Sequence, residues 1–120
     1  MAITFLTTED VLTIVAALGA GPVRDIGLIE SAVARPRTTL FGVDAYPTVP
    51  LKAAALLHSL VRNHALVDGN KRTGWLSFTV FLDLNGLAVV MEHAAAYDLV
   101  LDVAQDKPSL DEIVTVCGLG

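Results

Sequence analysis

Apolar residues recur at helical spacing through the first third of this chain and predict two helices there. The first stripe consists of Val11, Ile14, Val15 and Leu18. Thr7 or Thr8 is placed to cap this helix, and the glycine- and proline-containing run 19–22 is placed to end it. The second stripe consists of Ile26, Ile29 and Val33, and it predicts a helix over about 25–34 that stops before Pro36.

The middle of the chain predicts two longer helices. Thr48 and Pro50 open a third helix that continues to His64, and its apolar positions are Ala53, Leu56, Leu57, Leu60 and Val61. Asn70 is a plausible N-cap for a fourth helix, which carries Trp75, Leu76, Phe78, Val80, Phe81 and Leu82. These residues are apolar on nearly all sides of the helix, so we expect it in the middle of the domain, ending at Asn85-Gly86.

The remaining segments predict two more helices and two connectors. Residues 35–49 contain Gly42 and Pro47 and predict an extended loop or short hairpin. Residues 87–91 fit a short strand or an extended connector, 94–104 a fifth helix and 109–117 a sixth, where Ser109 and Glu112 match a capping box. The fold class expected is all-α, with about six helices in a single domain over residues 1–120.

Composition is consistent with one hydrophobic core and no membrane span. The chain has 120 residues, of which 53% are hydrophobic, and its single cysteine cannot form an intramolecular disulfide. The first eleven residues hold no Lys or Arg for a signal peptide, and the longest uncharged run, 11–23, is interrupted by glycine and proline and is too short to cross a bilayer. We therefore expect a cytoplasmic protein. A mean hydropathy of +0.60 is high for so small a domain and suggests that a partner covers some apolar surface.

Charge is distributed unevenly along the chain. The net charge of −5 argues against a general nucleic-acid binder. Residues 35–72 nevertheless hold six cationic and two acidic residues, a net +4, whereas the rest of the chain carries −9. This polarity suggests local binding of a small polyanion such as a nucleotide, although scattered solvated charges would give the same count.

The sequence HALVDGNKRTG at 64–74 lies in the basic segment, between the third and fourth predicted helices. The first turn of a helix presents unpaired N–H groups, so residues 69–73 are suited to bind an anion, and Lys71 and Arg72 add two cations. Asp68 is the only carboxylate there, and beside a polyphosphate it is suited to hold Mg²⁺. His64 can take a proton from an attacking hydroxyl near neutral pH.

Each of these residues also has a purely structural interpretation. His64 could pair with a helix dipole, Asp68-Gly69 could form a turn, and Asn70 could be only a cap. Two cations at a helix N-terminus are disfavoured by the dipole unless an anion offsets them, so the joint pattern favours a site. Of the other histidines, we interpret His58 as a core or semi-buried hydrogen-bonded residue and His93 as a surface or hinge residue, with no zinc set among them.

Taken with KAAALLHSLVRN before it and GLIESAVARP at 27–36, the motif resembles the Doc branch of the Fic/Doc family, the death-on-curing toxins of bacterial toxin–antitoxin modules. The family pattern is HxFx[DE]GNxR. The resemblance implies a small all-helical domain with a flap near the active site, at residues 37–48 here. Leu66 stands where the family has phenylalanine, and we expect it to anchor the loop in the core.

The resemblance also implies a reaction. Fic proteins typically move AMP from ATP to a protein hydroxyl, whereas Doc toxins transfer the γ-phosphoryl group to a threonine of elongation factor Tu and arrest translation. AMP-transferring members usually carry a second arginine where this chain has Trp75, and a glycine where it has Lys71. Both differences favour a kinase, with AMP transfer and a catalytically dead binding module as alternatives.

Carried over position by position, the family assigns a role to each motif residue. His64 would be the base and Asp68 the Mg²⁺ ligand. The ATP phosphates would be held by Gly69, Asn70, Lys71 and Arg72, with Arg62 supplying a further cation. The resemblance also implies a cognate antitoxin, whose disordered tail would bind as a helix in an apolar groove.

Overall fold

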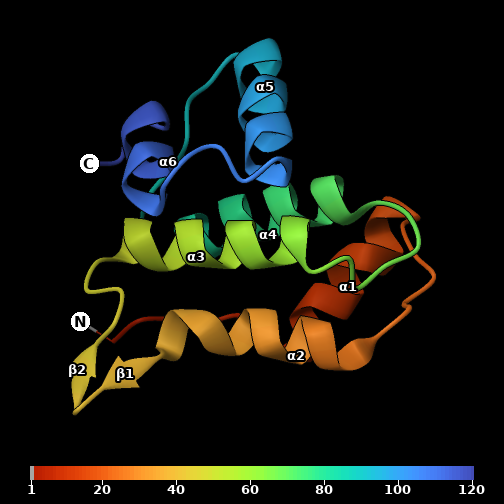
Figure 1. Ribbon diagram of the computed structural model, residues 1–120, viewed down its shortest axis with the longest axis horizontal. Helices are drawn as coiled ribbons and strands as arrows, with labels where there is room; N and C mark the ends of the chain where they lie inside the picture. The colour runs from red at the N-terminus through yellow and green to blue at the C-terminus, as the bar shows by residue number, and fades with distance from the viewer. Residues whose placement is uncertain (1) are drawn as a thin grey trace.

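Helix α3 (Val49–Arg62) runs through the middle of the computed structural model, which describes residues 2–120 (Figure 1). Around it lie α1 (Thr8–Leu18), α2 (Ile26–Ala34), α4 (Asn70–Leu84), α5 (His93–Ala104) and α6 (Leu110–Val116). A short 3-10 turn, η1 (Arg35–Arg37), and two strands, β1 (Thr39–Leu40) and β2 (Val43–Asp44), complete the fold. The expected all-α class with six helices is confirmed over the described residues.

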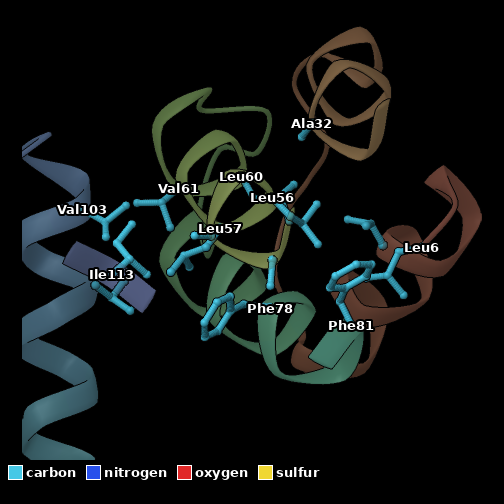
Figure 2. Packing of buried hydrophobic residues seen from close by; sticks show 14 of the residues in the cluster. Leu6, Ala32, Leu56, Leu57, Leu60, Val61, Phe78, Phe81, Val103 and Ile113 are labelled. Carbon is cyan, nitrogen blue, oxygen red and sulfur yellow. The ribbon is translucent and has the colours of Figure 1, made fainter. Parts of the chain in front are cut away.

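The core forms around α3 because its side chains are buried on almost every face. Helix α3 contacts α2, α4, α5 and α6. Figure 2 shows its leucines between Phe78 and Phe81 of α4 on one side and Ala32 of α2 on another, with Val103 and Ile113 beyond Val61. Helix α4 approaches closely at Gly74, where an added Cβ would lie 2.7 Å from Val61 Cγ2. A small residue is therefore required at the crossing of the two helices.

The predicted helix ends form largely as expected. Thr7 caps α1, and Ser109 and Glu112 form the capping box of α6, with hydrogen bonds of 3.0 and 3.1 Å. Thr48 caps α3 by accepting a hydrogen bond from the Leu51 N–H at 3.2 Å. Residues 87–91 form an extended connector and no strand. Among residues 2–120, no helix combines the length and apolarity needed to span a membrane.

A hairpin forms within the predicted flap, but at the other end of α3 from the motif. Thr39 pairs with Asp44 and Leu40 with Val43. Lys52, in the first turn of α3, fixes the base of the hairpin by bonding Asp44 at 3.1 Å and the Tyr46 carbonyl. Because the motif follows the far end of the same helix, the expectation of a flap near the site is wrong (Figure 1).

Two cations of the basic segment, Lys52 and Arg35, are used inside the fold. Lys52 is only 2% exposed and is paired with Asp44, so it contributes no charge to the motif. The guanidinium of Arg35 donates to Tyr46 Oη at 2.8 Å and lies 2.8 Å from His58 Nδ1. His58 Nε2 lies 2.8 Å from Asp106 Oδ1, which confirms the expectation of a semi-buried, hydrogen-bonded histidine.

Candidate functional site

The loop between α3 and α4 begins with a sharp change of direction at His64. Helix α3 ends at Arg62, Asn63 keeps helical angles, and His64 has a φ of +54°. This left-handed conformation turns the chain out of the helix, a task that glycine or asparagine more often performs. The turn leaves the His64 side chain exposed at the start of the loop.

The same loop is held against the connection between α1 and α2. Arg24 N–H donates to the Ala65 carbonyl at 2.7 Å, and Val67 N–H donates to the Pro22 carbonyl at 2.9 Å. Gly21 N–H donates to the Asp68 carbonyl at 2.8 Å. These bonds fix the backbone of residues 65–68 in an extended path beside residues 21–24.

Leu66 and Asn70 anchor the loop from inside. Leu66 is 3% exposed, as expected for the residue that replaces the family phenylalanine. The side-chain amide of Asn70 makes two hydrogen bonds to the backbone of Leu66. Its Oδ1 accepts from the Leu66 N–H at 3.0 Å, and its Nδ2 donates to the Leu66 carbonyl at 2.9 Å. Asn70 is therefore the first residue of α4 and not its N-cap, which corrects the sequence prediction.

The N-cap of α4 is Gly69, and no other residue fits there. Its φ of +89° is strained for any residue with a side chain, and an added Cβ would lie 2.5 Å from the Cβ of Ala20. The sequence pattern pointed to Asn70 because asparagine is a common cap, but here its side chain is already used by Leu66.

A cavity of about 520 Å³ opens where this loop, α4 and α5 meet. The loop and the first turn of α4 supply the polar lining, which consists of His64, Asp68, Gly69, Asn70, Lys71 and Arg72. The rest is mainly apolar and consists of Val61, Val67, Trp75, His93, Ala96, Tyr97, Val100, Leu101 and Ala104. The structure thus brings the predicted site residues within the motif to one cavity that also has an apolar wall.

The polar part of the cavity has the properties of an anion site. The first hydrogen bond within α4 joins Thr73 N–H to the Gly69 carbonyl at 2.9 Å, so the N–H groups of residues 70–72 have no acceptor in the helix. Lys71 and Arg72 are exposed beside them. Arg72 lies 3.7 Å from Asp68, and both side chains are more than half exposed, so solvent screens this pair.

Comparison with known proteins identifies the family to which this site belongs. Residues 5–82 match the model of the Fic/DOC family. The chain belongs to the Fic/DOC family. It is also 53% identical over 113 residues to "Toxin Doc" of Mycolicibacterium smegmatis (strain ATCC 700084 / mc(2)155), a match that covers 91% of this chain and 87% of that protein.

Asp68 is the residue of this Fic/DOC site suited to a metal ion. Among residues 2–120, no three His, Cys, Asp or Glu side chains gather into a metal-binding group. Mg²⁺ does not need such a group, because it binds through one or two carboxylates together with phosphate oxygens and water. A single exposed carboxylate beside the anion site fits that requirement.

Arg62 is the predicted site residue that the structure does not bring to the Fic/DOC cavity. Its Nη1 donates to the Ala104 carbonyl at 2.7 Å, at the C-terminal end of α5. Cations commonly bond the last carbonyls of a helix, and this bond ties α5 to α3 beside the cavity. Arg62 therefore supports a wall of the cavity, and the expectation that it adds a cation to the site is corrected.

Three residues near the site were not predicted from the sequence. His93 and Tyr97 line the cavity from α5, where their spacing of four places them on one face. That spacing was visible in the sequence, but nothing in it showed that this face meets the motif. The third is Arg24, whose side chain bonds the His64 carbonyl from a segment forty positions away.

Proposed function

We propose that this chain is a Doc-like protein kinase toxin that transfers the γ-phosphoryl group of ATP to a threonine hydroxyl of elongation factor Tu. The observation that carries the proposal is the single cavity shared by His64, Asp68, Lys71 and Arg72 at the first turn of α4. Membership of the Fic/DOC family and the similarity to a protein named "Toxin Doc" support it.

In this proposal the first turn of α4 holds the phosphates of ATP. The N–H groups of residues 70–72 would donate to phosphate oxygens, with Lys71 and Arg72 beside them. Arg72 would exchange its long contacts with Asp68 and with the Leu18 carbonyl, to which its Nη1 donates at 3.4 Å, for a phosphate, which costs little because both contacts are solvent-exposed. Phosphoryl transfer has a loose transition state with charge spread over the moving oxygens, so fixed donors and cations account for most of the catalysis.

His64 would act as the base and Asp68 as the metal ligand. The neutral imidazole would take the proton of the threonine hydroxyl as its oxygen bonds to the γ-phosphorus and the bond to the β-phosphate oxygen breaks, releasing ADP. Mg²⁺ held by Asp68 would neutralise charge on the phosphates. Asn70 would act through the loop, because its amide is committed to the Leu66 backbone.

Trp75 favours phosphoryl transfer over AMP transfer. It stands where AMP-transferring relatives usually carry a second arginine, and it lines the cavity with an indole ring whose centroid lies 5.3 Å from that of the Phe78 ring. An indole cannot neutralise the distal phosphates as a guanidinium would. The site as built therefore concentrates its cations at Lys71 and Arg72.

The same proposal includes a cognate antitoxin. Its disordered tail would fold into a helix against apolar residues of the cavity wall, where Tyr97 is 59% exposed. Such a helix would occupy the space beside the anion site and exclude nucleotide. The high mean hydropathy of the chain agrees with a covered surface.

The proposal is tested by incubating the protein with ATP, Mg²⁺ and elongation factor Tu and weighing the target by intact-protein mass spectrometry. One added phosphoryl group on a threonine is expected, and one added AMP would overturn the kinase assignment. An unmodified target together with tight antitoxin binding would instead indicate a binding module. His64→Ala should slow transfer by about a hundredfold or more, because the base is lost. Arg37→Ala, an exposed arginine outside the cavity, should leave the rate unchanged.

A further inference from the structure

Arg24, in the connection between α1 and α2, holds the backbone of His64 from outside the cavity. Its Nε donates to the His64 carbonyl at 3.0 Å, and its Nη2 donates to the same oxygen. The backbone N–H of Arg24 bonds the next carbonyl, that of Ala65, at 2.7 Å. One residue therefore fixes two successive carbonyls of the loop that begins with His64.

These bonds act on a backbone conformation that histidine does not adopt readily. His64 has a φ of +54°, where a side chain crowds the backbone. The peptide group after His64 must keep its orientation for this turn to persist, and the two guanidinium N–H groups bond the oxygen of that group. The orientation of this peptide and the φ of His64 together set the direction in which the imidazole leaves the chain.

Arg24 is itself well anchored, so it can act as a fixed support. The next residue, Asp25, caps α2 by accepting the Gly27 N–H at 3.0 Å, and its own N–H also reaches the Ala65 carbonyl at 3.1 Å. The backbone of residues 24–25 is thus fixed to a helix start and to the loop. Because the Arg24 guanidinium projects from this fixed backbone, it holds the His64 carbonyl in place relative to the start of α2.

We propose that Arg24 is a positioning residue for His64, which aims the imidazole at the attacking hydroxyl. The inference rests on the proposed function, in which His64 is the base. Arg24 is not among the residues that line the cavity, and its Nε and Nη2 are directed at a backbone carbonyl. Its role is therefore distinct from that of Lys71 and Arg72, which face the space that phosphates would occupy.

Steady-state kinetics of Arg24→Gln and Arg24→Lys test the proposal, with Arg37→Gln as a matched loss of an exposed arginine. We expect Arg24→Gln to lower kcat by about a hundredfold, because misplacement of a base by about 1 Å has that effect, and to leave the KM for ATP unchanged. Arg24→Lys should recover part of kcat, since an ammonium can still donate to the carbonyl. A raised KM with unchanged kcat would show that Arg24 binds nucleotide and would overturn the proposal.

Amide hydrogen exchange tests the same contact without any substrate. In Arg24→Gln, the N–H groups of residues 24 and 67 should exchange about tenfold faster, while those of α3 keep their protection. If exchange became faster at all amides alike, the variant would be generally destabilised. If exchange at residues 24 and 67 did not change, Arg24 would not hold the loop. Either result would overturn the proposal. If the wild-type protein transfers no phosphoryl group, the proposed function fails, and exchange still decides whether Arg24 holds the His64 peptide.

Discussion

Asn70 lines the cavity, but its side-chain amide is bonded to the backbone of the preceding loop. Its amide makes both hydrogen bonds that the Leu66 backbone needs, at a point where Leu66 is buried. The amide suits this task because it donates and accepts at once, which neither a carboxylate nor an amine can do at neutral pH. Its neighbour Lys71 is exposed and directed to the cavity. Of these two adjacent motif residues, the side chain of Asn70 is bonded within the fold, whereas that of Lys71 is free to meet a ligand in the proposed function.

Asn70→Ala and Lys71→Ala should separate these two roles. Asn70→Ala leaves two buried backbone groups without partners and should lower the free energy of unfolding by about 3 kcal/mol. Lys71→Ala should change it by less than about 0.5 kcal/mol while lowering transfer activity. Urea denaturation followed by circular dichroism measures both. Asn70→Asp, which keeps the acceptor only, should fall between wild type and alanine; an Asn70→Ala protein as stable as wild type would contradict the assignment.

The charged residues of the basic segment differ in how far the sequence predicts their position. That Asp68, Lys71 and Arg72 line one cavity was predictable, because those residues are close in sequence and lie at the start of one helix. Arg62 and Lys52 looked equally available, yet each is bound to a group that lies elsewhere in the chain, Ala104 and the hairpin base respectively. A charge count along the sequence cannot reveal such pairing, because it contains no information on tertiary contact.

At the scale of elements, the crossing of α3 and α4 depends on Gly74. Alanine there would place a Cβ 2.7 Å from Val61 Cγ2, in a helix where alanine is otherwise favoured over glycine by about 1 kcal/mol. Gly74→Ala should therefore destabilise the protein by about 1 kcal/mol net, because overpacking outweighs the gain in propensity. In the double variant with Val61→Ala, the two losses should not add, since the smaller side chain leaves room for the new methyl group. Additive losses in denaturation experiments would argue against a direct clash.

The capping box of α6 should make this helix sensitive to acid. The backbone N–H of Ser109, and then its hydroxyl, hold the pKa of Glu112 below its ordinary value of 4.5. The folded state therefore favours the carboxylate, so its contribution is present above pH 4.5 and is lost as the pH falls through the lowered pKa. The difference in Tm between wild type and Glu112→Gln should shrink as the pH falls from about 6 to about 3. A difference that stays constant would show that the carboxylate charge does not matter.

The helices were predictable, and the placement of the hairpin was not. Local sequence indicates where helices begin, through residues such as Thr7, Thr48 and Ser109. All three are N-caps in the structure. The hairpin over 39–44 was also foreseen as an element, but it was expected near the motif. Residues 45–48 alone connect it to α3, so it lies at the N-terminal end of that helix, where Lys52 pairs with Asp44, whereas the motif follows the C-terminal end.

At the scale of the whole molecule, Arg35 joins three parts of the chain. Its guanidinium contacts Tyr46 after the hairpin, and Ser59 and His58 in α3, and His58 in turn meets Asp106 between α5 and α6. Arginine can only donate, so His58 Nδ1 accepts and Nε2 donates to Asp106. This hydrogen bond, together with the charge of Arg62, lowers the pKa of Asp106. His58 therefore links the hairpin side of the molecule to its C-terminal helices.

Loss of Arg35 should weaken the molecule as a whole. Arg35→Ala removes a charged donor from several partly buried acceptors and should lower the free energy of unfolding by about 3 kcal/mol. The matched control is Arg37→Ala, two residues away, whose guanidinium lies 4.6 Å from the centre of the Phe5 ring. Its loss should cost only about 0.5–1 kcal/mol, as for an exposed cation–π contact. Equal effects of the two variants in denaturant titrations would show that the Arg35 network adds nothing of its own.

The remoteness of the hairpin from the cavity makes it a natural point of attachment for a reporter dye. Phe41 at its tip is fully exposed, while Cys117, the single cysteine of the chain, is buried and its pKa is raised by that burial to about 11. Maleimides react with thiolates, so a Phe41→Cys protein should accept one dye at the hairpin and leave Cys117 unmodified, as peptide mass mapping would show. Binding of a partner protein at the motif could then be followed by the fluorescence anisotropy of this label, because the complex tumbles more slowly than the free protein.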